Sequence, residues 1–476
     1  MKTKAFSINV LNQARHTEPC RVAGLAAALL GLLALGASSG ETADPTPVGA
    51  EAVREAAKAG TIAFKLTTPE ELRGLLGRPE REEKKRDGDM EMMTQEFSNA
   101  KAVFCRLVEL PGPYTLVELQ VGGTQVDIGG QRQVVLRTVD DLNKLDSFWG
   151  LAGVSAARLD LRGQLSRLSR LTFDSGTVWP GQDKLPEGFN PARLLEEGKN
   201  PGLGARGLHS AAIDGRGVGI AIIDQPLLRE HEQYRDRIVR YEAVDVEGVG
   251  PQMHGPAVAS IAVGKDCGVA PGASLYYFAV PTWKWRQNAP WAELLERIVR
   301  LNNNPKNTPR IRVVSISLGA FSQRPDYARW KQALQRAEEA NILVVTCDPD
   351  FLRLGTLKRD ENRLETKPAD YSRGLFFYPG AALCVPAANR TLASFRGPRL
   401  YTYDRTGGLS WTVPYLAGVA ALGWQVDPNI KPREMVELWQ RTAAKTAVGP
   451  VIDPGALIEA IHSRSQKEGC GARLSD

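Results

Sequence analysis

Three polar residues stand where strands are expected to end or helices to begin, in the order aspartate, histidine, serine. Asp224 closes the apolar run GVGIAIID, His254 opens the small-residue segment HGPAVASIAVG, and Ser410 follows a glycine pair in GGLSWTVP. A serine hydroxyl becomes a nucleophile when a base lies within hydrogen-bonding reach and a carboxylate fixes the tautomer of that base. The three residues therefore predict nucleophilic hydrolysis: Ser410 attacks, His254 moves the proton and Asp224 orients the imidazole.

Each of these residues also has a structural interpretation. An aspartate after a strand is most often a turn residue, a lone histidine is most often a core or surface residue, and a serine before a helix is a good N-cap. His254 is favoured as the base because its small neighbours permit close packing, while His231, in the loop LLREHEQ, stays open as an alternative. The joint pattern weakens the structural interpretations, because three independent coincidences rarely fall in one order.

The elements that must position these residues alternate between apolar strands and helices after Gly215. This alternation predicts βαβ crossovers and a parallel sheet covered on both faces, so the expected fold class is α/β, a three-layer sandwich with a mainly parallel central sheet. Ligands of such sheets gather outside the carboxyl ends of the strands. The expected strands are 217–224, 274–280, 312–319 and 343–348, and the expected helices are 256–264, 292–304 and 328–342.

The chain before this region has the pattern of a small α+β unit. Thr68 and the acidic residues after it predict a capped helix in TPEELRGLLG, and VGGTQ and GGQ have the composition of hairpin turns. The charged run REEKKRDGD, residues 81–89, is interpreted as a solvated turn. Alternation of apolar and polar residues predicts strands at 61–66, 91–97, 100–107, 114–121 and 132–139.

The first 39 residues have the pattern of an export signal. Four basic residues precede the apolar run VAGLAAALLGLLALGA, and small residues follow it. The alternative is an uncleaved membrane anchor. We divide the chain into a signal peptide at 1–39, an α+β pro- or accessory region with a linker at 40–205, an α/β domain at 206–465 and a polar tail at 466–476, and we expect an extracytoplasmic, secreted or periplasmic, location.

Charge and cysteine content exclude several classes of function. Lysine and arginine exceed aspartate and glutamate by six and are scattered along the chain, so no nucleic-acid partner is expected. No CxxC motif or Cys/His cluster occurs, so no metal site is expected. Five cysteines follow the signal at irregular spacing, which predicts no disulfide framework and leaves one or two bridges open.

Several ordered motifs resemble those of the subtilisin-like serine peptidases, the subtilase or peptidase S8 family. GLSWTVPYLAG is similar to the family's G-T-S-M-A-T-P-H-V-A-G, and His254-Gly255 with Val258-Ala259 is similar to H-G-T-H-V-A-G. GVAPGASLYYFAV and SISLG resemble two further motifs, and VIDPGALIEAI resembles the last helix of the family. The resemblance covers roughly residues 205–465. An α/β-hydrolase is disfavoured because the serine comes last and lies outside a GxSxG motif.

The resemblance implies an exported serine endopeptidase that cleaves polypeptides through an acyl-enzyme. It also implies that Ser317, Leu318 and Gly319 bind an extended substrate by strand addition. No cofactor is required, and structural calcium, frequent in the family, is left open because no compact acidic loop is evident. We expect a monomer without a stable membrane partner.

Three departures from the family pattern bear on activity. Gln225-Pro226 replaces the usual residues after the aspartate, and Ala257 replaces a second, non-catalytic histidine. The family's oxyanion-binding asparagine is aligned with Asp350, or with Asp348. An ionised carboxylate only accepts hydrogen bonds, and loss of one oxyanion donor costs about 10² to 10³ in rate, although a protonated Asp350 would still donate. The alternative function is a catalytically weak or inactive peptide-binding protein on the same scaffold.

Overall fold

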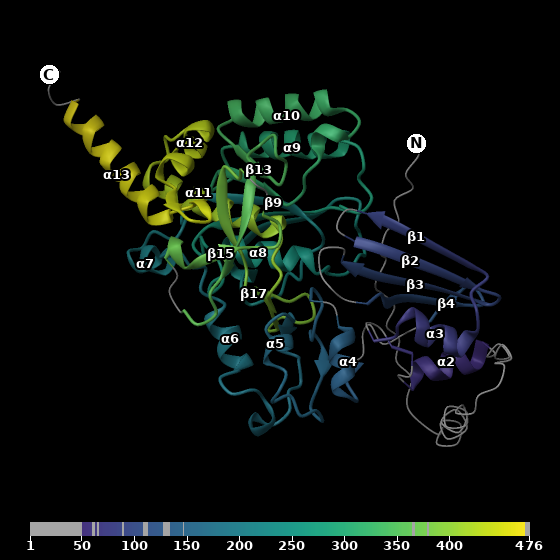
Figure 1. The fold of residues 1–476 in the computed structure, drawn as a ribbon. Helices are drawn as coiled ribbons and strands as arrows, with labels where there is room; N and C mark the ends of the chain where they lie inside the picture. Colours follow the sequence, from purple (N-terminus) through teal and green to yellow (C-terminus); the bar gives the residue numbers. More distant parts are fainter. Residues whose placement is uncertain are drawn as a thin grey trace, which may run out of the picture. The chain divides into compact units, whose positions relative to one another are not determined.

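The computed structural model describes residues 50–471 except 60–61, 64–65, 88–89, 108–112, 127–133, 146, 364–366 and 378–379. The described chain forms two compact units that meet in sequence at Phe189 and Asn190 (Figure 1). The export signal expected at residues 1–39 and the GGQ hairpin lie outside the described residues, and the domain boundary expected at residue 205 stays a prediction. Within the described ranges, no helix has both the length and the apolar character needed to cross a membrane.

A parallel sheet of five short strands forms the centre of the C-terminal unit. Its order is β10-β11-β9-β12-β13, and every neighbouring pair is parallel. All six residues of β9 are buried, as expected for a strand covered on both faces. The strands are β9 (Gly219–Asp224), β10 (Ile238–Ala243), β11 (Ser274–Ala279), β12 (Ile311–Ile316) and β13 (Leu343–Thr346).

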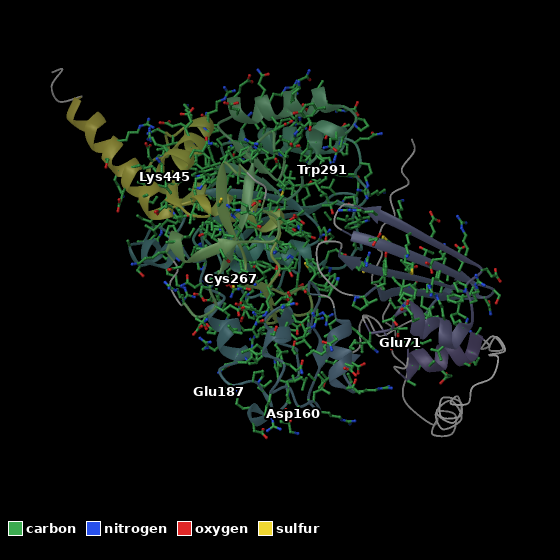
Figure 2. All side chains as sticks on the ribbon, viewed as in Figure 1. Glu71, Asp160, Glu187, Cys267, Trp291 and Lys445 are labelled. Atoms are coloured by element: carbon green, nitrogen blue, oxygen red, sulfur yellow. The ribbon has the colours of Figure 1, made fainter. Side chains whose placement is uncertain are left out.

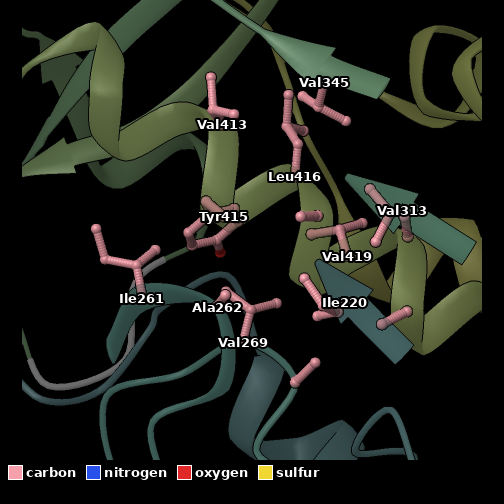
Figure 3. Close-up of a cluster of buried hydrophobic side chains, with 14 of the residues drawn as sticks. Ile220, Ile261, Ala262, Val269, Val313, Val345, Val413, Tyr415, Leu416 and Val419 are labelled. Carbon is pink, nitrogen blue, oxygen red and sulfur yellow. The ribbon is translucent and has the colours of Figure 1, made fainter. Parts of the chain in front are cut away.

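Helices cover both faces of this sheet, so the predicted three-layer α/β fold is confirmed. Ile220 and Ile222 of β9 join a core with two helices on one face, whereas Ala221 and Ile223 join a second core on the other face. In Figure 3, side chains of α8 and α11 gather around Ile220 in the first core. The covering helices are α8 (His254–Val263) and α11 (Leu409–Val426) on the first face, and α9 (Ala289–Asn302) and α10 (Tyr327–Glu339) on the second.

Large aromatic side chains fill the second core. Trp291 of α9, labelled in Figure 2, is fully buried and meets the ring of Phe321 edge to face at a centroid distance of 5.8 Å. Phe321 in turn stacks on Trp330 of α10 at 4.4 Å. Because aromatic rings bury large areas, these contacts fix α9 and α10 against the sheet.

A second sheet and two C-terminal helices complete this unit. The sheet has the order β15-β14-β16-β20-β19, and within it β14 pairs parallel with β16. VIDPGALIEAI leads into a long helix, as its resemblance implied. The elements are α6 (Pro191–Glu197), α7 (Ala205–Ser210), η2 (Arg235–Arg237), η3 (Phe321–Gln323), β14 (Leu354–Arg359), η4 (Pro368–Asp370), β15 (Tyr371–Arg373), β16 (Leu383–Ala388), β17 (Arg390–Ala393), β18 (Tyr401–Asp404), α12 (Pro432–Thr442), β19 (Ala444–Thr446), β20 (Gly449–Val451) and α13 (Pro454–Gly471).

The N-terminal unit contains an antiparallel sheet of the order β1-β2-β3-β4-β5 and an apolar core shared with two helices. Thr68 caps the second helix with the expected capping box. The VGGTQ hairpin is confirmed between β4 and β5, with two positive-φ glycines at its turn. The elements are α2 (Ala50–Lys58), α3 (Pro69–Leu76), β1 (Arg81–Asp87), β2 (Met90–Phe97), β3 (Ala100–Leu107), β4 (Thr115–Val121), β5 (Thr124–Gln125), β6 (Val134–Val135), α4 (Val139–Lys144), β7 (Val154–Ser155), α5 (Leu165–Leu168), β8 (Phe173–Asp174) and η1 (Gln182–Lys184).

Three local predictions in this unit are wrong. REEKKRDGD is not a turn, because β1 occupies most of it and pairs antiparallel with β2. This strand lies at the sheet edge, where charged side chains remain solvated and discourage pairing with another chain. The described residues of the run at 61–66 form no strand, and those of the run at 132–139 contain only the two-residue β6. Alternation of apolar and polar side chains alone did not distinguish the runs at 61–66 and 132–139 from true strands.

Cys267, Cys347 and Cys384 are free thiols, so no bridge forms among these three cysteines. Cys267 is fully buried in the interior of the C-terminal unit (Figure 2). Burial raises the pKa of the Cys267 thiol to about 12 and that of Cys384 to about 11. These thiols therefore act as small apolar core residues.

Candidate active site

Asp224 and His254 form a hydrogen-bonded pair at the carboxyl end of β9. Asp224 is 1% exposed, and its Oδ1 lies 2.7 Å from His254 Nδ1. The same oxygen accepts the backbone N–H of Gln225 at 2.7 Å. A carboxylate that accepts from Nδ1–H leaves Nε2 as the free base, which is the tautomer that serine activation requires. The structure thus brings together two of the three residues predicted from sequence.

The unusual Gln225-Pro226 turn packs directly against the start of α8. A Cβ on Gly255 would lie 2.4 Å from the Gln225 carbonyl oxygen and 2.6 Å from the Tyr277 hydroxyl, so only glycine fits there. The Tyr277 hydroxyl also donates to the Gln225 carbonyl at 2.5 Å, and Gln252 N–H donates to the Pro226 carbonyl at 2.9 Å. The turn after Asp224 therefore fixes the position of the residue that follows His254.

The alternative base His231 has a structural role. It is fully buried, Gln233 N–H donates to its Nδ1 at 3.2 Å, and its Nε2 donates to the Leu400 carbonyl at 2.9 Å. Burial lowers the pKa of this imidazole, which favours the neutral form that these contacts need. Because both ring nitrogens are engaged, His231 is not available to a serine.

Ser410 lies in the first turn of α11, three residues after a constrained glycine. Gly407 has a φ of +71°, and a Cβ there would lie 2.9 Å from the Ala388 backbone nitrogen. The helix is 18 residues long, and its first backbone N–H groups have no partner within the helix. Both these groups and the positive end of the helix dipole favour negative charge near Ser410.

Pro414 lies inside α11, beyond the first turn in which a proline is tolerated. In an unbroken helix, the N–H of residue 414 would donate to the carbonyl of Ser410, and proline lacks that N–H. The Ser317 hydroxyl supplies the missing donor, with its Oγ 2.8 Å from the Ser410 carbonyl oxygen. A side chain after β12 thereby holds the backbone of the candidate nucleophile.

The Ser410 hydroxyl donates to the Ser317 carbonyl at 3.4 Å. Among the hydrogen bonds between described residues, none joins Ser410 to His254. The next residue, Trp411, does reach the imidazole, with ring centroids 5.1 Å apart and an interplanar angle of 34°. Ser410 is therefore next in sequence to Trp411, which contacts His254. The hydroxyl of Ser410 itself is directed at Ser317.

The two aspartates considered for the oxyanion position have different surroundings. Buried Asp348 accepts the N–H groups of Phe321 at 2.8 Å and of Asp350 at 3.1 Å, one with each carboxylate oxygen. Exposed Asp350 accepts the Tyr327 hydroxyl at 2.9 Å and lines a cavity of about 550 Å³ together with residues of α10 and α12. Neither carboxylate has a described contact with Ser410, and the oxyanion role of Asp350 stays a prediction.

The predicted substrate segment Ser317, Leu318 and Gly319 follows β12 without belonging to a strand. Leu318 N–H donates to the Ile316 carbonyl at 2.7 Å, and the Leu318 carbonyl accepts Cys347 N–H at 3.0 Å. Strand addition at Leu318 would require these bonds to exchange. The substrate role of this segment stays a prediction.

Sequence reasoning did not identify Asp404 as part of this site. It is 4% exposed, ends β18 and contacts the turn that carries Ser410. The sequence offered one signal for Asp404: it is an acidic residue at the end of YTYD, three residues before the glycine pair that precedes Ser410. Within the ranges that the structure describes, no group of three or more His, Cys, Asp or Glu residues is arranged to hold a metal ion.

Comparison with known proteins gives one family. Residues 215–349, which include Asp224 and His254 and end before Ser410, match the profile of the subtilase family. The subtilisin-like protease PopC of Myxococcus xanthus (strain DK1622) is 25% identical over 276 residues, which is 50% of this chain and 58% of PopC. The serine protease AprX of Bacillus subtilis (strain 168) is 25% identical over 275 residues, 48% of this chain and 61% of AprX. The chain thus spans less than two thirds of either curated relative.

A solved structure, that of the prenylagaramide maturation protease PagA, is similar with a TM-score of 0.41 and 19% identity, covering 54% of this chain and 98% of that chain.

Proposed function

The C-terminal unit of this chain belongs to the subtilase family, and from that premise we propose that the protein is a serine endopeptidase that uses Asp224, His254 and Ser410. The observation that carries the proposal is the 2.7 Å bond between His254 Nδ1 and Asp224 Oδ1 at the carboxyl end of a central parallel strand. A buried carboxylate in this position orients the imidazole and stabilises the imidazolium that forms during proton transfer.

The proposed reaction uses these three residues in turn. Ser410 Oγ attacks the carbonyl carbon of a peptide bond while its proton passes to His254 Nε2, which requires the hydroxyl to turn away from Ser317. The tetrahedral oxyanion is stabilised by the Ser410 N–H and the start of α11. His254 then protonates the leaving amine, an acyl-enzyme forms at Ser410, and a water molecule deprotonated by the same imidazole hydrolyses it.

A fluorophosphonate probe tests the nucleophile directly. The purified protein should be labelled at Ser410, and Ser410→Ala should abolish both labelling and cleavage of a denatured protein substrate. Ser210→Ala, a matched change at a hydroxyl that donates to a helix carbonyl on the exposed side of α7, should leave both unchanged. A folded wild-type protein that remains unlabelled would exclude the proposal.

A second candidate function is peptide binding without turnover on the same scaffold. It is favoured by the Ser410 hydroxyl, which donates to Ser317 instead of the imidazole, and by Asp350 at the aligned oxyanion position. A fluorescent peptide that binds wild-type protein with no product after prolonged incubation would support it. Turnover that depends on Ser410 would exclude it.

Export and maturation are further proposals that rest on the pattern of residues 1–39. Sequencing the N-terminus of protein recovered from each cell fraction would give both the location and the start of the mature chain, and would decide whether residues 40–205 are removed. We also propose a monomer that requires no cofactor. Light scattering tests the mass, and activity and melting temperature with and without a calcium chelator test whether calcium stabilises the fold.

A further inference from the structure

A single buried carboxylate connects both ends of the turn that carries Ser410. Asp404 Oδ1 accepts the backbone N–H of Thr406 at 2.9 Å and of Gly407 at 3.1 Å. Its Oδ2 accepts the indole N–H of Trp411 at 2.5 Å. Ser410 lies between these attachment points, so the carboxylate restrains the turn before the serine and the side chain after it.

Trp411 extends this restraint to the candidate base. Its indole is 3% exposed and lies against the imidazole of His254. Asp224 holds the same imidazole through Nδ1. Asp224 therefore fixes one edge of the imidazole, and Trp411 lies against the ring. Together these contacts leave the imidazole few alternative orientations.

The charge of Asp404 is compensated by its surroundings. Burial raises the pKa of this carboxyl, and the N–H groups of Gly407, Trp411 and Thr406 and the charge of Arg390 oppose that effect. A buried carboxylate is stable when its oxygens accept several hydrogen bonds, and bonds to charged acceptors are stronger than neutral ones. The link from Asp404 to Trp411 is therefore a strong contact inside the core.

We propose that Asp404 and Trp411 form one positioning unit for the catalytic site: Asp404 holds Trp411, and Trp411 holds His254 while both fix the Ser410 turn. This inference rests on the proposed peptidase function. Trp411 acts through His254 and Asp404 acts through Trp411, so neither takes part in the chemical step. Their contribution belongs to kcat, because they orient the reacting groups, and much less to KM.

A double-mutant cycle tests whether the two residues act as one unit. In Asp404→Asn, the amide oxygen still accepts from Thr406 and Gly407, but the NH₂ group faces the indole N–H, donor against donor. This variant should lower kcat about tenfold or more, with KM changed less than about threefold. Trp411→Phe keeps an aromatic ring beside His254 and should lower kcat less than Asp404→Asn. The double variant removes the donor conflict and should recover at least about threefold in kcat over Asp404→Asn.

Trp424→Phe is the matched control. Trp424 lies on the same helix, is 2% exposed and donates its indole N–H to the Ile430 carbonyl at 2.9 Å. It should leave kcat and KM unchanged. If the two single effects multiply in the double variant, if the changes fall on KM, or if Trp424→Phe has the same effect, Asp404 and Trp411 do not act as a positioning unit.

A spectroscopic measurement separates failure of this inference from failure of the proposed function. The ¹⁵N–¹H resonance of the Trp411 indole should lie apart from other indoles in the wild type and should shift in Asp404→Asn, whether or not the protein is active. If the fluorophosphonate probe does not label the wild-type protein but the indole resonance shifts in Asp404→Asn, the peptidase function alone is excluded. If the probe labels the wild-type protein and the protein is active, but Asp404→Asn changes neither the indole resonance nor kcat, the positioning unit alone is overturned.

Discussion

The bond between Ser317 and Ser410 gives a quantitative prediction. Ser317→Ala removes the hydroxyl that donates to the Ser410 carbonyl at 2.8 Å, and Pro414 leaves that carbonyl without its normal helical donor. Ser317 is 8% exposed, so water reaches this position poorly. Leaving a buried carbonyl without a partner costs about 1–3 kcal/mol. We expect the free energy of unfolding to fall by about that amount.

A second variant identifies the cause of this loss. Pro414→Ala restores an N–H that can donate to the Ser410 carbonyl, so Ser317→Ala should cost less than about 0.5 kcal/mol in the Pro414→Ala background. Urea unfolding followed by tryptophan fluorescence would measure all four proteins of the cycle, with Ser210→Ala as the control at an exposed hydroxyl. Equal losses in both backgrounds would show that the hydroxyl does not replace the missing helical bond, and the reasoning would be refuted.

Three further predictions concern the His254 turn, the oxyanion position and the buried thiols. Gly255→Ala should slow fluorophosphonate labelling of Ser410 more than tenfold, because its Cβ would lie 2.4 Å from the Gln225 carbonyl oxygen. Gly207→Ala is the control, since a Cβ there has no atom within 4 Å, and it should not slow labelling. Equal labelling rates in the two variants would contradict this prediction. Asp350→Asn should preserve or raise turnover by up to about 10²-fold in a peptide-cleavage assay, and a decrease would refute the alignment of Asp350 with the oxyanion asparagine. Cys267 and Cys384, with pKa values of about 12 and about 11, should resist iodoacetamide at pH 8 until urea is added. Because folding raises these pKa values above the usual 9.0, their stabilising contribution should be present below pH 9 and be lost as pH rises toward 11 and 12, as unfolding at increasing pH would measure.

Four of the five strands of the central sheet were predictable because burial on both faces leaves a clear signal in sequence, whereas the partly exposed β10 was not predicted. β9, β11 and β12 appear as apolar runs separated by helices, and their expected positions agree with the structure to within a few residues. β1 was missed for the opposite reason: an edge strand needs few apolar side chains, so its charges had the appearance of a turn. The helix of Thr68 was predictable because its capping residues are local in sequence.

The candidate site was predictable where chemistry depends on residue type and not where it depends on tertiary contact. Asp224 and His254 were identified from their positions at a strand end and a helix start, and the structure pairs them. The donor that replaces the bond missing at Pro414 comes from Ser317, 93 residues before Ser410, and no local pattern reveals it. Asp404 was missed because its partners become visible only once the turn is folded.

Close packing of two helices explains how these distant residues reach one site. His254 begins α8 and Ser410 lies at the beginning of α11, and a Cβ on Gly418 of α11 would lie 2.6 Å from Val269 Cβ and 3.4 Å from the Ala262 carbonyl oxygen of α8. The clash would fall on Val269, in the segment that follows α8, so the absence of a side chain at Gly418 lets α11 pack closely against that segment. Because packed cores change shape only in discrete steps, this close packing restricts how α11 can shift against α8 and the segment after it. The small residues in both helices thus matter to the chemistry as much as to the core.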